Sequence, residues 1–122
     1  MLRSFLFGAL CYPALEMCWR GRTHWSMAIA GGLSSALIFR VSRFCGRNAC
    51  KALLCTAGIT IIEYTAGKAV NRRFKVWDYR RLPLNLQGQV CVPYMVLWYG
   101  MSLCMLHVID NCKRITDDQD RP

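Results

Sequence analysis

The chain has 122 residues, 54% of them hydrophobic, and it carries a net charge of +9. This length suits one domain, and the basic residues cluster between four apolar stretches instead of being mixed into them, which is typical of a small multi-pass membrane protein. The expected partner is therefore a lipid bilayer and not nucleic acid, since the charge lies where lipid headgroups would be and no helix-turn-helix, zinc or RNA-binding signature is present.

The predicted membrane helices, in chain order, are Ser4–Trp19, Trp25–Phe39, Ala49–Val70 and Val90–Ile109. About 20 apolar residues span the hydrocarbon core, so the first two stretches are short and would need tilt or local thinning of the bilayer. The sequence thus predicts an all-α bundle of four transmembrane helices in a single domain over residues 1–112, followed by a polar C-terminal tail at 113–122. Four crossings place equal numbers of basic residues on the two sides, so charge predicts no orientation.

The first stretch begins like a secretory signal peptide, with Arg3 ahead of an apolar run. No small-residue cleavage site follows, and Glu16 and Trp19 lie where cleavage would occur. We therefore expect an uncleaved first membrane segment.

Glu63 is the most informative residue, because it lies inside the third apolar stretch. An ionisable group at the depth of the bilayer centre costs about 2.5 kcal/mol or more unless it is paired or hydrated. On a helix, Thr56, Thr60, Gly67 and Asn71 would share one face with it, since they recur at steps of three or four residues. We expect this polar-to-small stripe to face the bundle interior or an aqueous cavity.

Two roles for Glu63 stay open. It lines a substrate path or binds a cationic group, or it is neutralised in a buried ion pair that fixes helix register without any substrate. The side chains considered beside it, as polar neighbours or as ion-pair partners, are Glu16, Arg22, His24, Thr60 and Arg72.

Other chemistry finds little support in the sequence. The eight cysteines form no C-x-x-C pair and no metal-ligand spacing with His24 or His107. Most lie inside apolar runs, where a free cysteine behaves as a small hydrophobe, so we expect buried reduced thiols and no metal or other cofactor. Glu63, Glu16, His24 and Asp78 would offer acid and base groups, but no nucleophile motif accompanies them, and we expect no enzyme.

Two segments between the apolar stretches, residues 19–27 and 76–91, combine Trp or Tyr with Arg. Such segments are expected at the membrane interface, where aromatic rings lie at headgroup level and Arg reaches phosphates. Asp78 is expected to pair with a neighbouring cation, and Pro83 and Gly88 to shape a tight connection into the last helix. Thr23 is expected to cap the second helix.

A series of motifs carries a family resemblance. Glu63-Tyr64-x-x-Gly67, then Trp77-Asp78-Tyr79, Pro83-x-Asn85-x-x-Gly88 and Trp98 resemble, in this order, the ABC-transporter type IV (CmpB-like) family of small membrane proteins. The stretch from Arg20 to Met27, with Gly31-Gly32 after it, resembles the short members of that family. The resemblance covers about Leu15 to Gly100. Family members commonly carry Ser after Trp-Asp-Tyr, whereas this chain has Arg80, which makes the loop more basic.

The resemblance implies a small multi-pass protein of the bacterial plasma membrane that serves as the permease component of an ABC transporter of unknown substrate. No Gly-x-x-x-x-Gly-Lys-Ser/Thr loop occurs in these 122 residues, so ATP hydrolysis would need a separate ATP-binding subunit. Four short helices enclose little space, so a homo-oligomer or association with other membrane subunits is expected. The alternative is a non-transporting accessory or structural membrane protein in which Glu63 is part of a buried ion pair.

Overall fold

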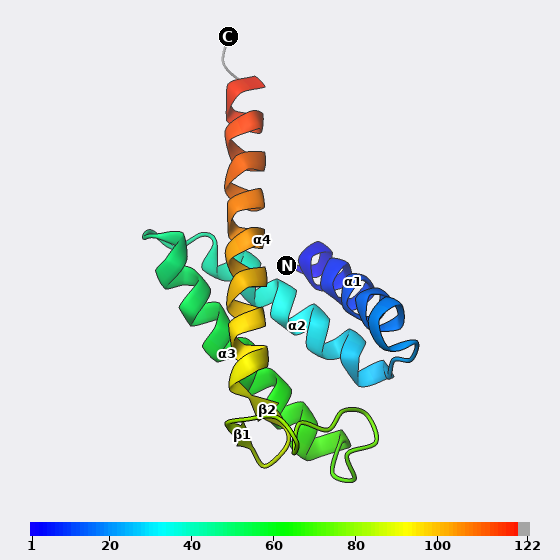
Figure 1. Cartoon of the computed structure of the whole chain (residues 1–122). Coiled ribbons are helices and arrows are strands. Elements are labelled where there is room, and N and C mark those ends of the chain that lie inside the picture. Colours follow the sequence, from blue (N-terminus) through cyan, green and yellow to red (C-terminus); the bar gives the residue numbers. More distant parts are fainter. Residues whose placement is uncertain (120–122) are drawn as a thin grey trace.

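Four α-helices and one short hairpin make up the computed structural model, which describes residues 1–119, with side chains as far as Asp117 (Figure 1). The helices are α1 (Leu2–Arg20), α2 (Trp25–Val41), α3 (Asn48–Val70) and α4 (Val92–Gln119), and the strands β1 (Asn85–Leu86) and β2 (Val90–Cys91) pair antiparallel. The all-α fold with four helices is confirmed, and each helix starts within two residues of its predicted position. The hairpin was not predicted.

Two of the four helices meet the length and hydropathy requirements of a membrane-crossing helix. These are α3 and the part of α4 from Val92 to Asp117, whereas α2 is apolar but only 17 residues long. At about 1.5 Å per residue, α2 reaches about 25 Å, short of a hydrocarbon core of about 30 Å. The four-span prediction is thus supported in length and composition for two helices, and a crossing by α1 and α2 stays a prediction.

The last helix is longer than its apolar stretch. α4 continues to Gln119, so residues 113–119 of the predicted tail extend the helix, while residues 120–122 lie outside the described part of the chain. Between Gly100 and the end of this helix the sequence contains no Pro or Gly that would break it. Polar residues also form helices, so the helix continues past the last apolar residue. The predicted end at Ile109 marked the end of hydrophobicity and not the end of the helix.

α2 lies at the centre of the packing, with α1 on one side and α3 on the other, while α4 runs along α3 (Figure 1). α1 packs mainly on α2, because small residues let the two helices approach closely. A Cβ added to Gly8 would lie 2.2 Å from the carbonyl oxygen of Gly31. The main apolar core, around Ile38, Cys55 and Leu106, joins α2, α3 and α4 and leaves α1 at its edge.

Side-chain contacts place the connections at alternating ends of the bundle. The Arg20 guanidinium at the end of α1 donates to the Val76 carbonyl oxygen at 2.7 Å, so the α1–α2 turn lies beside the loop that follows α3. At the other end, Asn48 Nδ2 donates to Asp110 Oδ2 at 2.9 Å, next to the α2–α3 turn. Four crossings of a bilayer require this alternation.

The start of α2 corrects one prediction. His24, and not Thr23, is the N-cap, since its Nδ1 accepts the Ser26 backbone N–H at 3.3 Å. The Thr23 hydroxyl instead donates to Glu16 Oε2 at 2.8 Å. The helix begins at Trp25, one position too late for a Thr23 cap.

All eight cysteines are free, as expected for reduced thiols. The prediction that they are buried is wrong for most of them. Only Cys55 and Cys91 are buried, and the five exposed ones are Cys18, Cys45, Cys50, Cys104 and Cys112. An apolar stretch that crosses a bilayer presents an outer face as well as an inner one, so lying inside such a stretch does not imply burial within the protein.

Candidate functional site

Glu63 lies in the interior of the bundle, on the face of α3 that α1 and α4 approach. The residue is 6% exposed. The Trp98 indole N–H on α4 donates to Oε2 at 2.9 Å, and the Tyr12 hydroxyl on α1 donates to Oε1 at 3.4 Å. The two donor rings are themselves neighbours, with centroids 5.7 Å apart. A carboxylate has about four acceptor positions, so these two bonds leave acceptor positions unused.

The polar-to-small stripe of α3 faces inward, as predicted. Thr56, Glu63, Gly67 and Asn71 are buried, and Thr60 is half-buried. The two threonine hydroxyls, however, donate to the carbonyl oxygens four residues earlier, each at 2.8 Å. Thr60 therefore has no hydrogen bond with Glu63, and its hydroxyl is occupied by the helix's own backbone.

A cavity of about 460 Å³ lies beside Glu63 and is lined by all four helices. Most of its wall is apolar. The hydroxyls of Ser35 (6% exposed) and Ser102 (0% exposed) are buried in the same wall and have no hydrogen-bond partner among the described residues. The rim carries exposed apolar side chains from α1 and α4, namely Phe7, Leu15 and Met101.

None of the predicted cations lies at Glu63. Arg22 is exposed, His24 bonds Ser26, and the Arg72 side chain is exposed and donates to the Lys68 carbonyl oxygen. Glu16, considered as a neighbour of Glu63, instead forms an ion pair with Arg20 at 3.0 Å. Over the part of the chain with described side chains, the carboxylate of Glu63 has no ion-pair partner. The structure brings two neutral aromatic donors to Glu63, where the sequence had suggested a cation as one alternative.

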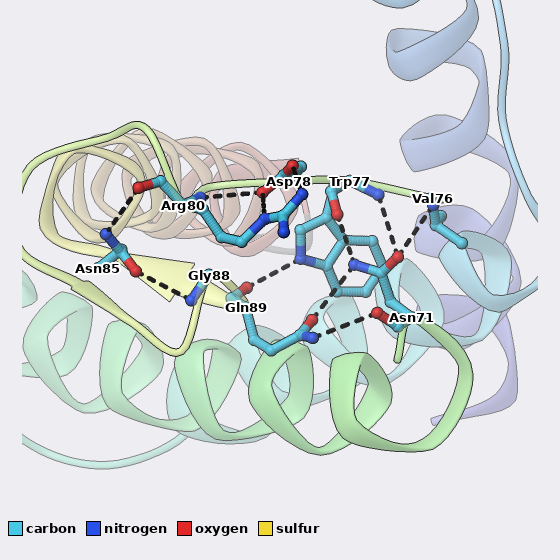
Figure 2. A network of polar contacts seen from close by, with 8 residues as sticks. All are labelled: Asn71, Val76, Trp77, Asp78, Arg80, Asn85, Gly88 and Gln89. Carbon is cyan, nitrogen blue, oxygen red and sulfur yellow. Dashed lines mark hydrogen bonds and ion pairs between the residues drawn. The ribbon is translucent and has the colours of Figure 1, made fainter. Parts of the chain in front are cut away.

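The loop after α3 is fastened by a buried polar cluster that we call the Asn71 network, consisting of Asn71, Val76, Trp77 and Gln89 (Figure 2). Asn71 is fully buried. Its Oδ1 accepts the Val76 N–H at 2.9 Å, and its Nδ2 donates to the Trp77 carbonyl oxygen at 2.6 Å and to Gln89 Oε1 at 3.2 Å. Gln89 Nε2 donates back to the Asn71 carbonyl oxygen at 3.3 Å, and the Trp77 indole N–H donates to the Gln89 carbonyl oxygen at 2.8 Å.

Gly67 is the helix position on which this network rests. A Cβ there would lie 2.2 Å from Gln89 Oε1 and 3.1 Å from Trp77 Cζ2. Real Cβ atoms do not approach other atoms so closely, so the loop packs on α3 only because residue 67 has no side chain. The Gly of the Glu-Tyr-x-x-Gly motif therefore has a packing role.

The rest of the loop motif forms a tight turn around Asn85. Asn85 Nδ2 donates to the Leu82 carbonyl oxygen at 2.9 Å, and Asn85 Oδ1 accepts the Gly88 N–H at 2.9 Å. Gly88 has a φ of +66°, a conformation that favours glycine, and its carbonyl oxygen accepts the Tyr79 N–H at 3.0 Å (Figure 2 shows the Asn85–Gly88 bond). Pro83 is exposed at the edge of the turn.

Asp78 pairs with Arg80, which confirms the predicted pairing with a neighbouring cation. The two side chains are 2.7 Å apart and solvent-exposed. Hydrogen bonds from the Arg80 side chain and backbone lower the pKa of Asp78 to about 2. The Arg80 guanidinium also lies over the Phe74 ring, 4.2 Å from its centroid. The arginine that departs from the family pattern is thus bound into the loop.

The sequence did not identify four residues of the cavity beside Glu63 and of the Asn71 network, namely Tyr12, Ser35, Ser102 and Gln89. Trp98 belonged to the motif series, but its partner was not identified. A polar Gln89 at the entrance to an apolar stretch was a usable signal. Tyr12 and the two serines gave none, because their importance depends on how the helices are rotated against one another.

Comparison with known proteins bears on the family. A sequence model of the family described as "Putative ABC-transporter type IV" matches residues 3–119, a wider span than the motifs cover. No curated protein and no solved structure matches the chain.

Proposed function

The chain belongs to the ABC-transporter type IV family, and we propose that it is the multi-pass, permease-type component of a transporter in the bacterial plasma membrane. The observation that carries this proposal is Glu63, a buried carboxylate that lines a cavity between four helices and pairs with no cation among the residues with described side chains. Ionisable groups inside membrane helices are rare and mark substrate paths, ion paths and proton relays.

The outer faces of the helices support a position within the bilayer. Every helix exposes large apolar side chains, for example Leu10 on α1, Leu33 on α2, Leu53 on α3 and Val96 on α4. Water-soluble proteins rarely expose contiguous apolar surface on all sides, whereas lipid accepts it. Because α1 and α2 share this feature with α3 and α4, we include them among the membrane-crossing helices.

The energy source would lie outside these 122 residues. They contain no phosphate-binding Gly-x-x-x-x-Gly-Lys-Ser/Thr loop, so a separate ATP-binding subunit would supply ATP hydrolysis. Four helices of this length enclose little space, so further copies or other membrane subunits would complete a path.

A second function is favoured by the contacts of Glu63 themselves. Its bonds to Trp98 and Tyr12 join three helices, which would stabilise the bundle in a non-transporting accessory protein. This alternative predicts that loss of the carboxylate mainly destabilises the fold, whereas the permease function predicts that it mainly removes activity.

Partner capture tests the permease function. The tagged full chain is purified from native membranes in mild detergent, and the co-purifying proteins are identified by mass spectrometry, with untagged membranes as the control. We expect an ATP-binding subunit at constant stoichiometry. Recovery of the chain alone, or of an unrelated membrane complex, would contradict a permease function.

Cysteine labelling tests the four crossings. One variant keeps Cys45, in the α2–α3 turn, as the only exposed cysteine, and a second replaces it and carries Arg22→Cys in the α1–α2 turn. In oriented vesicles, a membrane-impermeant maleimide should label the two variants from opposite sides. Labelling from the same side would mean that α2 does not cross.

A further inference from the structure

We propose that the cavity beside Glu63 binds a lipophilic amine, a molecule with a protonated amino group and a hydrocarbon body. The inference rests on the proposed function and names the chemical class that the site would take. Three features of the cavity carry it: a carboxylate and two hydroxyls that lack an ion-pair or hydrogen-bond partner, respectively, in the described part of the chain, and an apolar wall with an exposed apolar rim.

The charge of the site selects a cation. Glu63 is bonded only to neutral donors, and no cation pairs with it in the described part of the chain. Attraction between opposite charges is strong where the surroundings are apolar, and an ammonium group offers three N–H donors to the free acceptor positions of the carboxylate. A carboxylic acid or a phosphate would be repelled by the same group.

Two serines add polar groups to the wall of the cavity that Glu63 lines. The Ser35 hydroxyl on α2 and the Ser102 hydroxyl on α4 are buried in the cavity wall, and neither has a partner among residues with described side chains. A buried hydroxyl without a hydrogen bond is rare in native proteins and calls for an explanation. Each hydroxyl can accept a hydrogen bond from a polar group of a ligand held in the cavity.

The rest of the cavity suits hydrocarbon. Its volume of about 460 Å³ lies within the range of about 300–1,000 Å³ found for small-molecule pockets. Apolar side chains such as Ile38, Ile59 and Met105 line it. The rim residues Phe7, Leu15 and Met101 are exposed, as are apolar side chains on the outer faces of the helices. A ligand would therefore enter from the lipid phase, which an alkylamine reaches readily and a sugar does not.

Photo-crosslinking tests the proposal on the full chain in phosphatidylcholine nanodiscs. The probe is dodecylamine with a diazirine in its alkyl chain, and the crosslinked residues are found by mass spectrometry. We expect crosslinks on the cavity-lining faces of α1 and α4. Dodecylamine should compete at least about tenfold better than dodecanol, which has the same chain and no charge.

Two variants and a control assign the effect to the site. Glu63→Gln should remove the preference for amine over alcohol. The matched control is Asp110→Asn, because Asp110 is a carboxylate of α4 that bonds Asn48 and does not line the cavity, and it should leave the preference unchanged. If Glu63→Gln does not fold, the double variant Ser35→Ala and Ser102→Ala should still weaken competition by dodecylamine several-fold.

The results separate this proposal from the function on which it rests. Equal competition by dodecanol, crosslinks spread over the outer helix faces, or crosslinks to a second copy of the chain seated in the cavity would each overturn the lipophilic-amine site. If amine binding fails while an ATP-binding subunit co-purifies, only the ligand class is wrong. If the amine binds and no such subunit is found, the site stands and the permease function fails.

Discussion

Two regions of the molecule, the Asn71 network and the cavity beside Glu63, share helix α3 and the same series of family motifs. They differ in how completely their buried polar groups are hydrogen-bonded. In the Asn71 network, both side-chain polar atoms of Asn71 are bonded, and Gln89 and Trp77 return bonds to the same cluster. In the cavity, Glu63 keeps unused acceptor positions and the hydroxyls of Ser35 and Ser102 have no partner in the described part of the chain.

The difference separates structural motif residues from functional ones. A buried polar group that is fully bonded holds the backbone in one conformation, whereas a partly bonded one costs stability unless something else completes it. We therefore interpret Glu63 as the functional residue. The residues that hold the loop on α3 are structural, namely Gly67, Asn71, Trp77, Asn85 and Gly88. Single substitutions in the two regions test this distinction.

Asn71→Ala should have the largest effect. It removes the partners of the Val76 N–H and the Trp77 carbonyl oxygen, and leaves Gln89 incompletely bonded in a buried site. The expected loss is about 3 kcal/mol of unfolding free energy, measured by denaturant titration in detergent micelles. The matched control is Asn111→Ala, an exposed amide on α4, with an expected change within about 0.5 kcal/mol. Similar losses of unfolding free energy in both variants would show that the network does not stabilise the fold.

Gly67→Ala tests the close approach of loop and helix. The added Cβ meets Gln89 Oε1, which cannot move without breaking its bonds to Asn71, so we expect a loss of about 1–3 kcal/mol. Gly100→Ala on α4 is the control, because nothing lies within 4 Å of its Cβ position. Removing a helical glycine should there stabilise the protein by about 0.5–1 kcal/mol, so the two substitutions should differ in sign.

Ser102→Ala should raise the stability of the protein, whereas the same substitution of a hydrogen-bonded serine should lower it. Because its buried hydroxyl lacks a partner among the described residues, its removal should stabilise the ligand-free protein by about 1 kcal/mol. Ser42→Ala is the control, since its hydroxyl is also buried but donates to the Phe39 carbonyl oxygen at 2.9 Å, and its loss should destabilise. A destabilised Ser102→Ala variant would show that this hydroxyl is bonded.

The Asp78–Arg80 pair should give the smallest effect. The pKa of Asp78 is lowered from 3.8 to about 2 in the fold, so its contribution to stability is present above pH 3.8 and is lost as the pH falls through about 2. The difference in unfolding free energy between wild type and Asp78→Asn should follow this course. Because both side chains are exposed, salt should shrink it. A difference that persists below pH 2 would contradict the assignment to this ion pair.

Much of the fold was readable from the sequence, because apolar length and turn residues determine where helices start. The inward face of α3 was also predictable, since the positions of Thr56, Glu63 and Asn71 follow from helical periodicity alone. The partners of Glu63 were not, because Tyr12 and Trp98 reach it only through the rotation of α1 and α4 about their axes. The helical extension beyond Ile109 was missed because hydropathy reports burial in lipid and not helix formation.

The loop shows the same limit. Its motif residues were recognised, but which of them meet was not predictable, since a bond such as that from Asn71 to Gln89 joins positions 18 residues apart. The cation considered as one alternative at Glu63 was likewise an inference from charge alone. A carboxylate inside an apolar stretch predicts that it has a partner. It does not predict whether that partner is an arginine, two aromatic donors or a ligand.

The most direct test of the account is the unfolding free energy of Glu63→Gln, measured beside wild type and Asn71→Ala under the same conditions. Glutamine keeps an acceptor for the Trp98 N–H and cannot carry a charge, so a residue kept for binding should be replaceable at a cost below about 1 kcal/mol. A loss as large as that of Asn71→Ala would show that Glu63 holds the bundle together, and would favour an accessory protein over a permease.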